Sequence, residues 1–337
     1  MAYAACLVLL PLPAAAWERG VVERFATLPA GAPNPEGITV DRNGDVYVTG
    51  FVPTGAGIGQ VFVFDNDGRL RRTLKVADSS GALLGIAFHP DTHQLLVIDI
   101  GKGRVVSVNP HTGASAVFTT IPDLTPDNPN AGPGPNALTF DKDGNVYISD
   151  SFQGAIWRTG PKGGASAMWA QDALLTVSFP PFGFPPFGAN GLDFNKNQSA
   201  LFVANTGNDT VVRIPVTAGG AAGAAAVFTN SINGADGLFV DEEDNVWVCA
   251  NQSDEIVVLD KTGKAISKLG DFNGVRDGSP VGLLFPASLA RDGESIYITN
   301  LSLDLRPVTG QQSVDSQWAQ QVTNHSIARI SARILGF

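Results

Sequence analysis

The chain has 337 residues, of which 44% are hydrophobic and 16% charged, so apolar material for a sizeable core is present and extensive disorder is excluded. The formal net charge is −10 and there is no basic run, which argues against a nucleic acid or an anionic membrane surface as partner. The 38 glycines and 22 prolines are scattered along the chain, a pattern typical of many short strands joined by turns.

The first 16 residues, MAYAACLVLLPLPAAA, have the pattern of a signal peptide. An apolar stretch over residues 4–12 precedes Ala14-Ala15-Ala16, a run of small residues typical of a cleavage site before Trp17. The stretch is too short to span a bilayer, and no other hydrophobic run of membrane length follows. We therefore expect a secreted or periplasmic protein whose mature domain covers residues 17–337. Cys249 is its single cysteine, expected as buried filler.

A phrase of about fifty residues recurs six times along the chain. Each copy begins with a lead residue, which in most copies is followed by Gly-Ile or Gly-Leu. An alternating apolar stretch, a turn and a second apolar stretch come after it. The lead positions are 36, 84, 136, 190, 236 and 287, which lie 48, 52, 54, 46 and 51 residues apart. A period of this length built from short alternating strands predicts the blades of a propeller.

The expected fold is therefore all-β: one six-bladed β-propeller domain with four-stranded blades and almost no helix. In blade one, the third and fourth strands are expected at residues 60–64 and 70–74. Blade six has a third strand at 326–330 and then runs out of chain, so the N-terminal segment 21–26 is expected to supply its fourth strand and close the ring. Sequences such as Asp41-Arg42-Asn43-Gly44 are expected to form hairpin turns rather than Ca²⁺ loops.

The six lead side chains are expected to converge on one mouth of the channel, because the first strand of a blade is innermost. They comprise two carboxylates, two carboxamides and two apolar residues. In chain order they are Glu36, Leu84, Asn136, Asn190, Asp236 and Ala287. Four oxygen donors and no His or Cys suit a hard divalent cation, Ca²⁺ before Zn²⁺, Mg²⁺ or Mn²⁺. Alternatively, these polar residues cap strand ends or hydrogen-bond across a wet channel.

Several stretches around the lead positions resemble the senescence marker protein/gluconolactonase/luciferin-regenerating-enzyme-like family, which is related to diisopropylfluorophosphatase. The stretches are residues 34–37, 134–138, 188–192, 234–237 and 245–250, and the similarity covers essentially the whole mature chain. The resemblance implies that Glu36, Asn190 and Asp236 bind the metal. It implies that Asn136 is a fourth ligand or a substrate contact, and that Asp236 acts as general base or nucleophile.

The resemblance implies a Ca²⁺-dependent hydrolase of a lactone or another small ester, in which the cation polarises a carbonyl oxygen and Asp236 activates water or attacks directly. Two other classes stay open: a non-catalytic propeller that binds a peptide, a glycan or a protein, and a strictosidine-synthase-like enzyme. Two carboxylates at the channel mouth argue against a pure scaffold. We expect a monomer whose partner is a small-molecule substrate.

Three insertions are expected on the face of the lead residues, at 50–59, 179–187 and 301–324. The second holds four Phe and four Pro and departs, like the third, from the compact pattern of the family, which leaves the substrate open. Being stiff and apolar, it is expected either to wall the pocket, with Phe182 and Phe187 touching an apolar part of the substrate, or to pack over the blade edge.

The four histidines show no metal-ligand spacing. Histidines 89, 93 and 111 are expected in solvated turns, and His325 is expected on the surface rather than at the substrate mouth.

Overall fold

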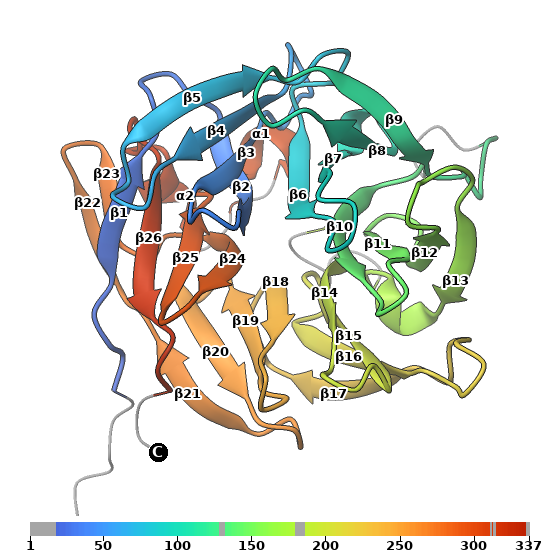
Figure 1. Ribbon diagram of the computed structural model, residues 1–337. Coiled ribbons are helices and arrows are strands. Elements are labelled where there is room, and N and C mark those ends of the chain that lie inside the picture. The colour runs from blue at the N-terminus through green and yellow to red at the C-terminus, as the bar shows by residue number, and fades with distance from the viewer. Residues whose placement is uncertain (1–17, 128–131, 179–185, 311, 313–314, 335–337) are drawn as a thin grey trace, which may run out of the picture.

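The computed structural model describes residues 18–127, 132–178, 186–310, 312 and 315–334. These residues form six four-stranded antiparallel sheets and one two-stranded sheet. The four-stranded sheets stand around a central channel like the blades of a propeller, and the chain passes through them in order (Figure 1). The prediction of an all-β, six-bladed propeller is thereby confirmed. The predicted signal peptide lies outside the described residues.

Each blade runs from an inner strand beside the channel to an outer strand at the rim (Figure 1). Blades one and two comprise β2 (Asn34–Val40), β3 (Val46–Phe51), β4 (Gln60–Phe64) and β5 (Leu70–Lys75), then β6 (Leu83–Phe88), β7 (Leu95–Asp99), β8 (Arg104–Val108) and β9 (Ser115–Thr120). Blades three and four comprise β10 (Pro135–Phe140), β11 (Val146–Asp150), β12 (Ala155–Thr159) and β13 (Ala167–Gln171), then β14 (Ala189–Phe194), β15 (Ala200–Asn205), β16 (Thr210–Pro215) and β17 (Ala226–Asn230).

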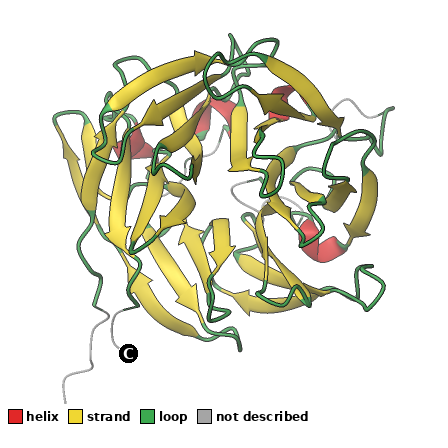
Figure 2. Ribbon diagram, viewed as in Figure 1, coloured by secondary structure: helices red, strands yellow, loops and turns green. Residues whose placement is uncertain are grey.

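Blade five comprises β18 (Ala235–Val240), β19 (Val246–Ala250), β20 (Glu255–Leu259) and β21 (Ala265–Leu269), and blade six comprises β24 (Pro286–Asp292), β25 (Ser295–Asn300), β26 (Ser326–Ser331) and β1 (Glu23–Thr27). A separate hairpin pairs β22 (Phe272–Arg276) with β23 (Ser279–Gly282). Helix in the described residues is confined to short pieces, visible in Figure 2: η1 (Ile100–Lys102), η2 (Ala173–Leu175), α1 (Arg306–Thr309) and α2 (Ser316–Ala319).

The N-terminal strand closes the ring. Strand β1 pairs antiparallel with β26, so that Glu23 lies opposite Arg329 and Thr27 opposite Ser326. The two side chains of the first pair also form an ion pair of 2.7 Å. Because the fourth strand of blade six comes from the other end of the chain, backbone hydrogen bonds within that blade tie the two ends of the chain together and close the ring, as predicted.

Glycine follows most lead residues because the inner strands approach one another closely. A Cβ atom at Gly37 would lie 2.4 Å from the carbonyl oxygen of Leu84, and one at Gly191 would lie 2.5 Å from the carbonyl oxygen of Asp236. Both distances are shorter than any real contact, so a side chain there would push neighbouring blades apart. The recurring glycine of the repeat therefore allows the inner strands to pack tightly around the channel.

The core lies between the blades rather than in the channel. The alternating residues of neighbouring sheets interdigitate there, for example Tyr147, Leu192 and Val203 between blades three and four. Trp247 and Ile298 belong to the equivalent cluster between blades five and six. Burying each such side chain contributes about 1.5–3 kcal/mol, so these interfaces fix the blades, and with them the lead residues, in place.

The Asp-rich sequences between first and second strands are hairpin turns, as predicted. The Oδ1 atom of Asp41 accepts hydrogen bonds from the backbone N–H groups of Asn43 and Asp45, at 2.8 and 3.0 Å. His89 corrects a prediction, because it is fully buried rather than solvated. Its Nε2 atom lies 2.8 Å from the carbonyl oxygen of Gly144 in the next blade.

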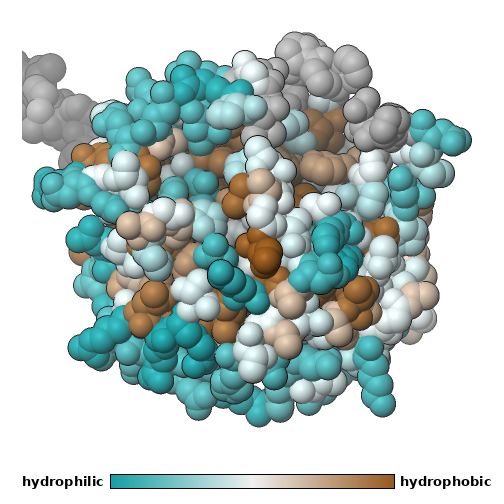
Figure 3. Space-filling view, turned by 90° about the horizontal axis from the view of Figure 1, so that it is seen from above, coloured by the Kyte–Doolittle hydropathy of each residue, from teal (hydrophilic) through white to brown (hydrophobic). Residues whose placement is uncertain are grey.

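The edge of the ring that lies uppermost in Figure 1 mixes hydrophilic and hydrophobic residues in small groups (Figure 3). Leu70 on β5 and Val117 on β9 are among the exposed large hydrophobic residues. Single exposed side chains of this kind are ordinary for a protein surface. Within the described part of the chain, no helix is long and apolar enough to cross a membrane.

Candidate functional site

A backbone irregularity sets the direction of every lead side chain. On each inner strand the pairing register with the second strand shifts around the lead residue, for example between Pro35 and Ile38 on β2 and between Ala235 and Leu238 on β18. Such shifts bend a strand and redirect a side chain. They allow the lead residue to turn from the plane of its blade toward the channel mouth.

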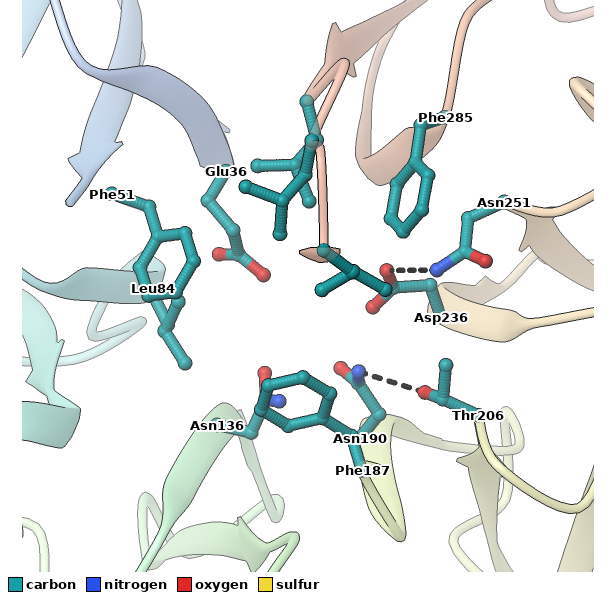
Figure 4. A pocket seen from close by; sticks show the side chains of 13 residues that line it. Glu36, Phe51, Leu84, Asn136, Phe187, Asn190, Thr206, Asp236, Asn251 and Phe285 are labelled. Atoms are coloured by element: carbon teal, nitrogen blue, oxygen red, sulfur yellow. Dashed lines mark hydrogen bonds between the residues drawn. The ribbon is translucent and has the colours of Figure 1, made fainter. Parts of the chain in front are cut away.

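The structure brings the four predicted polar residues together. Glu36, Asn136, Asn190 and Asp236 come from the inner strands of blades one, three, four and five, and all four line one pocket with Leu84. Their side chains point toward a common centre in Figure 4. Each of the four is only 4–5% exposed. The sixth lead residue is buried and, unlike the other five, does not line the pocket.

Neighbouring hydroxyl groups orient the two carboxamides. Asn190 donates from Nδ2 to the Oγ1 of Thr206 at 2.9 Å, and that hydroxyl donates its own proton to the carbonyl oxygen of Ala235 at 2.7 Å. Because the hydroxyl has one proton and has already used it, it can only accept from the amide. Asn136 is held in the same way by Ser151, at 3.1 Å. In both residues the amide nitrogen is occupied and the carbonyl oxygen stays available to the pocket.

The two carboxylates each keep one oxygen atom without a partner. Asp236 accepts a hydrogen bond on Oδ2 from Nδ2 of Asn251 at 2.8 Å, but its Oδ1 has none. The Oε2 atom of Glu36 is likewise buried without a partner. Burial, followed by repulsion from Asp236, raises the pKa of Glu36 well above its ordinary value. Burial raises the pKa of Asp236 to about 7, against the lowering effect of the hydrogen bond from Asn251 and of the nearby amide of Asn190.

This donor set fits a hard divalent cation. Two unpartnered carboxylate oxygens and two free carboxamide oxygens face one small space, which is costly unless a positive charge neutralises the carboxylates. No group of three or more His, Cys, Asp and Glu side chains placed to bind a metal occurs in the described parts of the chain. A site here would therefore depend on its carboxamides as much as on its carboxylates, a composition that suits Ca²⁺ better than a softer metal.

Apolar side chains cover the polar floor of the pocket. Phe51 and Leu84 lie on one side of the polar residues and Phe285 on the other, and the ring of Phe187 lies between Asn136 and Asn190 in the view of Figure 4. Three leucines of the blade-six insertion, residues 301, 303 and 305, complete the lining. Phe187, from the second predicted insertion, thus lines the pocket, whereas Phe182 lies outside the described residues, and contact of either ring with a substrate stays a prediction. An apolar cover excludes water and strengthens every electrostatic interaction beneath it.

The residues that orient the polar side chains were not singled out from the sequence. Ser151, Thr206 and Asn251 each come directly after the second strand of a blade, 15 or 16 residues beyond the lead residue of that blade. The repeat therefore carried a signal for them. In blades three, four and five, which have polar lead residues, the residue directly after the second strand is polar as well.

Two further groups, His325 and Cys249, have perturbed pKa values. His325 is half-buried rather than on the surface, which corrects the prediction; burial lowers its pKa to about 4. Cys249 is fully buried, as expected of a core residue. Burial, and then repulsion from Asp236 and Glu36, raises the pKa of its thiol, so the thiol is not a reactive nucleophile.

Part of the chain matches a known family. Residues 186–270 match the model of the SMP-30/Gluconolactonase/LRE-like region. The matched residues span blades four and five and include Asn190 and Asp236. The resemblance found around the lead positions is thereby confirmed over these residues. A search of curated protein sequences finds no match.

Solved structures with a similar fold cover nearly the whole chain. A luciferin-regenerating enzyme is 17% identical with a TM-score of 0.66, covering 94% of this chain and 96% of its own. A gluconolactonase from Xanthomonas campestris is 13% identical with a TM-score of 0.61, covering 92% and 89%. Regucalcin, a calcium-binding protein from Agrobacterium tumefaciens, is 15% identical with a TM-score of 0.61, covering 91% and 94%. At these identities the likeness shows the fold alone.

Proposed function

We propose that this protein is a hydrolase that depends on a divalent cation, Ca²⁺ before others, and opens a lactone or another small ester at the mouth of the propeller channel. One observation carries the proposal: two buried carboxylates, each with an unpartnered oxygen, face two carboxamides whose oxygens are free. The match of residues 186–270 to the gluconolactonase-containing family supports the reaction class, and the likeness to a calcium-binding propeller supports the choice of metal.

The cation would be held by Glu36, Asn190 and Asp236, with Asn136 as a fourth ligand or as a contact to the substrate. When bound, the cation would polarise the carbonyl oxygen of the ester as a Lewis acid. Unlike the side chains of a solvated cleft, these donors are already fixed, because hydroxyl and amide partners hold three of the four. Little reorganisation is therefore needed when substrate arrives.

Asp236 is the candidate general base. Asn251 holds its Oδ2 atom, which leaves Oδ1 directed into the pocket to take a proton from the attacking water. The water oxygen bonds to the acyl carbon, the bond from that carbon to the ring or alkoxy oxygen breaks, and the proton held by Asp236 passes to the leaving oxygen. The apolar cover keeps bulk water away from these steps. Direct attack by the carboxylate is the alternative role for the same atom.

Lactone hydrolysis measured with and without EDTA tests this proposal. We expect activity with Ca²⁺, its loss in EDTA, and its return when Ca²⁺ is restored. Asp236→Asn should lower kcat/KM by at least about 100-fold, the scale of a lost general base. The control is Glu242→Gln, which removes an exposed carboxylate from a turn of the same blade and should leave kcat/KM unchanged.

Full activity in EDTA, or in Asp236→Asn, would end the hydrolase proposal. Absence of activity toward any lactone or ester, together with tight cation binding, would favour a non-catalytic propeller or a different enzyme class such as the strictosidine-synthase-like one.

Export is a further part of the proposal. The signal-peptide pattern at residues 1–16 directs the chain to the periplasm or the exterior. The site has only two carboxylates, and so a formal charge of −2. Sites with fewer charged ligands bind Ca²⁺ more weakly, so this site suits surroundings where Ca²⁺ is plentiful.

A further inference from the structure

The chamber between the four polar residues is too small for a substrate. Its volume is about 30 Å³, where about 10–15 Å³ is needed to hold one water molecule. An ion with a water or two fits there, but the whole body of a lactone or an ester does not. The body of any substrate whose carbonyl reaches this chamber must therefore lie in an adjoining space.

A second, larger chamber adjoins the first. It has a volume of about 340 Å³, within the range of small-molecule sites. The two chambers share four lining residues, so they lie directly against each other. Its apolar lining includes the four shared residues, Phe51, Phe187, Leu303 and Leu305, together with Ile100 and Phe152.

The lining of the outer chamber includes no charged side chain in the described part of the chain. Its character follows from the repeat. The position after the second strand is polar in blades three to five, where it orients the polar residues of the site. In blades one and two the matching positions are Phe51, 15 residues after Glu36, and Ile100, 16 residues after Leu84. The ring thus has a polar side and an apolar side, and the outer chamber opens over the apolar side.

Aromatic rings border this chamber on its other side. Phe152 and Phe187 lie with ring centroids 5.7 Å apart. Phe152 is 48% exposed, so about half of its apolar surface is in contact with water. A ligand seated between these rings and the residues of blades one and two would cover that area.

We propose that the outer chamber is the subsite for an unbranched alkyl or acyl chain, so that the substrate is a hydrophobic lactone or ester rather than a polyhydroxylated sugar lactone. This inference rests on the proposed function, which places the carbonyl group of the substrate at the cation between the four polar residues. Hydroxyl groups of a sugar would lose their hydrogen bonds to water against these walls, whereas each methylene group would gain by burial.

A series of γ-lactones with side chains of increasing length tests the subsite. We expect kcat/KM to rise roughly three- to fourfold per methylene group until the chamber is full, the gain expected from burying a methylene. Thr54→Trp, at an exposed residue that lines the chamber, should fill it and abolish this dependence while sparing the shortest lactone. Met168→Trp is the matched control, because it adds the same side chain on the outer strand β13, away from the chamber.

A second measurement does not depend on catalysis. Saturation-transfer NMR with 2-nonanone, a ketone that cannot be hydrolysed, should show binding to the wild type and to Met168→Trp, and its loss in Thr54→Trp. If the ketone binds in this pattern but no lactone is opened, the subsite stands and the hydrolase proposal falls. If lactones are opened without regard to chain length and 2-nonanone does not bind, the subsite is overturned and the hydrolase proposal stands.

Discussion

The single proton of a neighbouring hydroxyl group determines the orientation of each carboxamide in the site. The hydroxyl of Thr206 donates to a backbone carbonyl of blade five, so it must accept from Asn190. The hydroxyl of Ser151 donates to a carbonyl of blade four and must accept from Asn136. Each hydroxyl also joins two neighbouring blades, so a displacement between blades would rotate the amide as well. Orientation of the donors and closure of the ring are therefore coupled.

Glu36→Gln tests whether the site is strained without its cation. At pH 8 in EDTA, we expect this variant to melt at a higher temperature than the wild type, because it removes a buried charge that repels Asp236. A gain of about 1–2 kcal/mol corresponds to a few degrees in a domain of this size. The increase in melting temperature that Ca²⁺ gives the wild type should be lost in the variant.

Glu255→Gln is the matched comparison. Glu255 is as buried as Glu36, but it forms ion pairs with Arg19 and Lys268. The same chemical change should therefore lower the melting temperature there. If both variants lower it in EDTA, Glu36 is an ordinary structural carboxylate and the argument for a cation loses its energetic basis.

The lead residues could be predicted from the sequence because each occupies one register position in a repeat. Their partners were overlooked because a residue after a strand reads as an ordinary loop residue until the neighbouring blade is in place. His89 was predicted to be solvated for a related reason: it follows a strand in a turn, but the turn of blade three covers it. Contacts between blades, unlike positions within a blade, leave no local pattern.

Two neighbouring carboxyl groups, Asp254 and Asp315, lie where the blade-six insertion meets blade five. Asp254, in the turn after β19, accepts the backbone N–H of Phe285 at 2.7 Å. Asp315, at the start of α2, is buried with its Oδ2 atom unpartnered. Burial, and then repulsion from Asp315, raises the pKa of Asp254 to about 8. Burial raises the pKa of Asp315 to about 6. The pair is held together best when it keeps a proton.

Asp315→Asn should reduce the loss of stability at high pH. The folded protein binds protons at this pair more tightly than the unfolded chain, whose ordinary aspartate pKa is 3.8. The stability that the pair contributes is therefore complete below about pH 4 and is lost as the pH rises through 6 and 8. Between pH 5 and pH 9, the melting temperature of the wild type should fall by several degrees more than that of the variant.

Asp67→Asn serves as the control for that comparison. Asp67 is exposed and pairs with Arg69, which is also exposed, so its replacement should change the melting temperature little at either pH. Equal pH dependence in the wild type, Asp315→Asn and Asp67→Asn would show that the pair at Asp254 and Asp315 does not titrate between these pH values.

The regular elements of the blades were predictable, and the elements between them were not. Alternation of apolar residues located the third and fourth strands of blade one, at 60–64 and 70–74, within one residue at each end. The β22–β23 hairpin and the short helices of the blade-six insertion have no repeat to reveal them. Helices of four residues contain too few turns for a periodic pattern, and their stability comes from packing, as Phe272 of the hairpin packs on Trp318 of α2.

At the scale of the whole molecule, ring closure makes the site possible. Glu36 and Asp236 belong to blades one and five, which flank blade six. The pairing of β1 with β26 inside blade six ties the two ends of the chain together and so holds blades one and five around the same channel. The recurring glycines let the inner strands converge, and the packed clusters between blades hold them there. The convergence of the lead residues could be predicted from a repeat of about fifty residues. The division of the ring into a polar and an apolar side could be seen only once the residues after the second strands were compared between blades.

The most direct test is a crystal structure of the protein soaked in Mn²⁺ as a substitute for Ca²⁺, with the metal located by its anomalous scattering. We expect one strong peak at the channel mouth, within about 2.1–2.6 Å of oxygen atoms of Glu36, Asn190 and Asp236. A well-ordered pocket without metal at saturating concentration, or metal bound only elsewhere on the propeller, would contradict it.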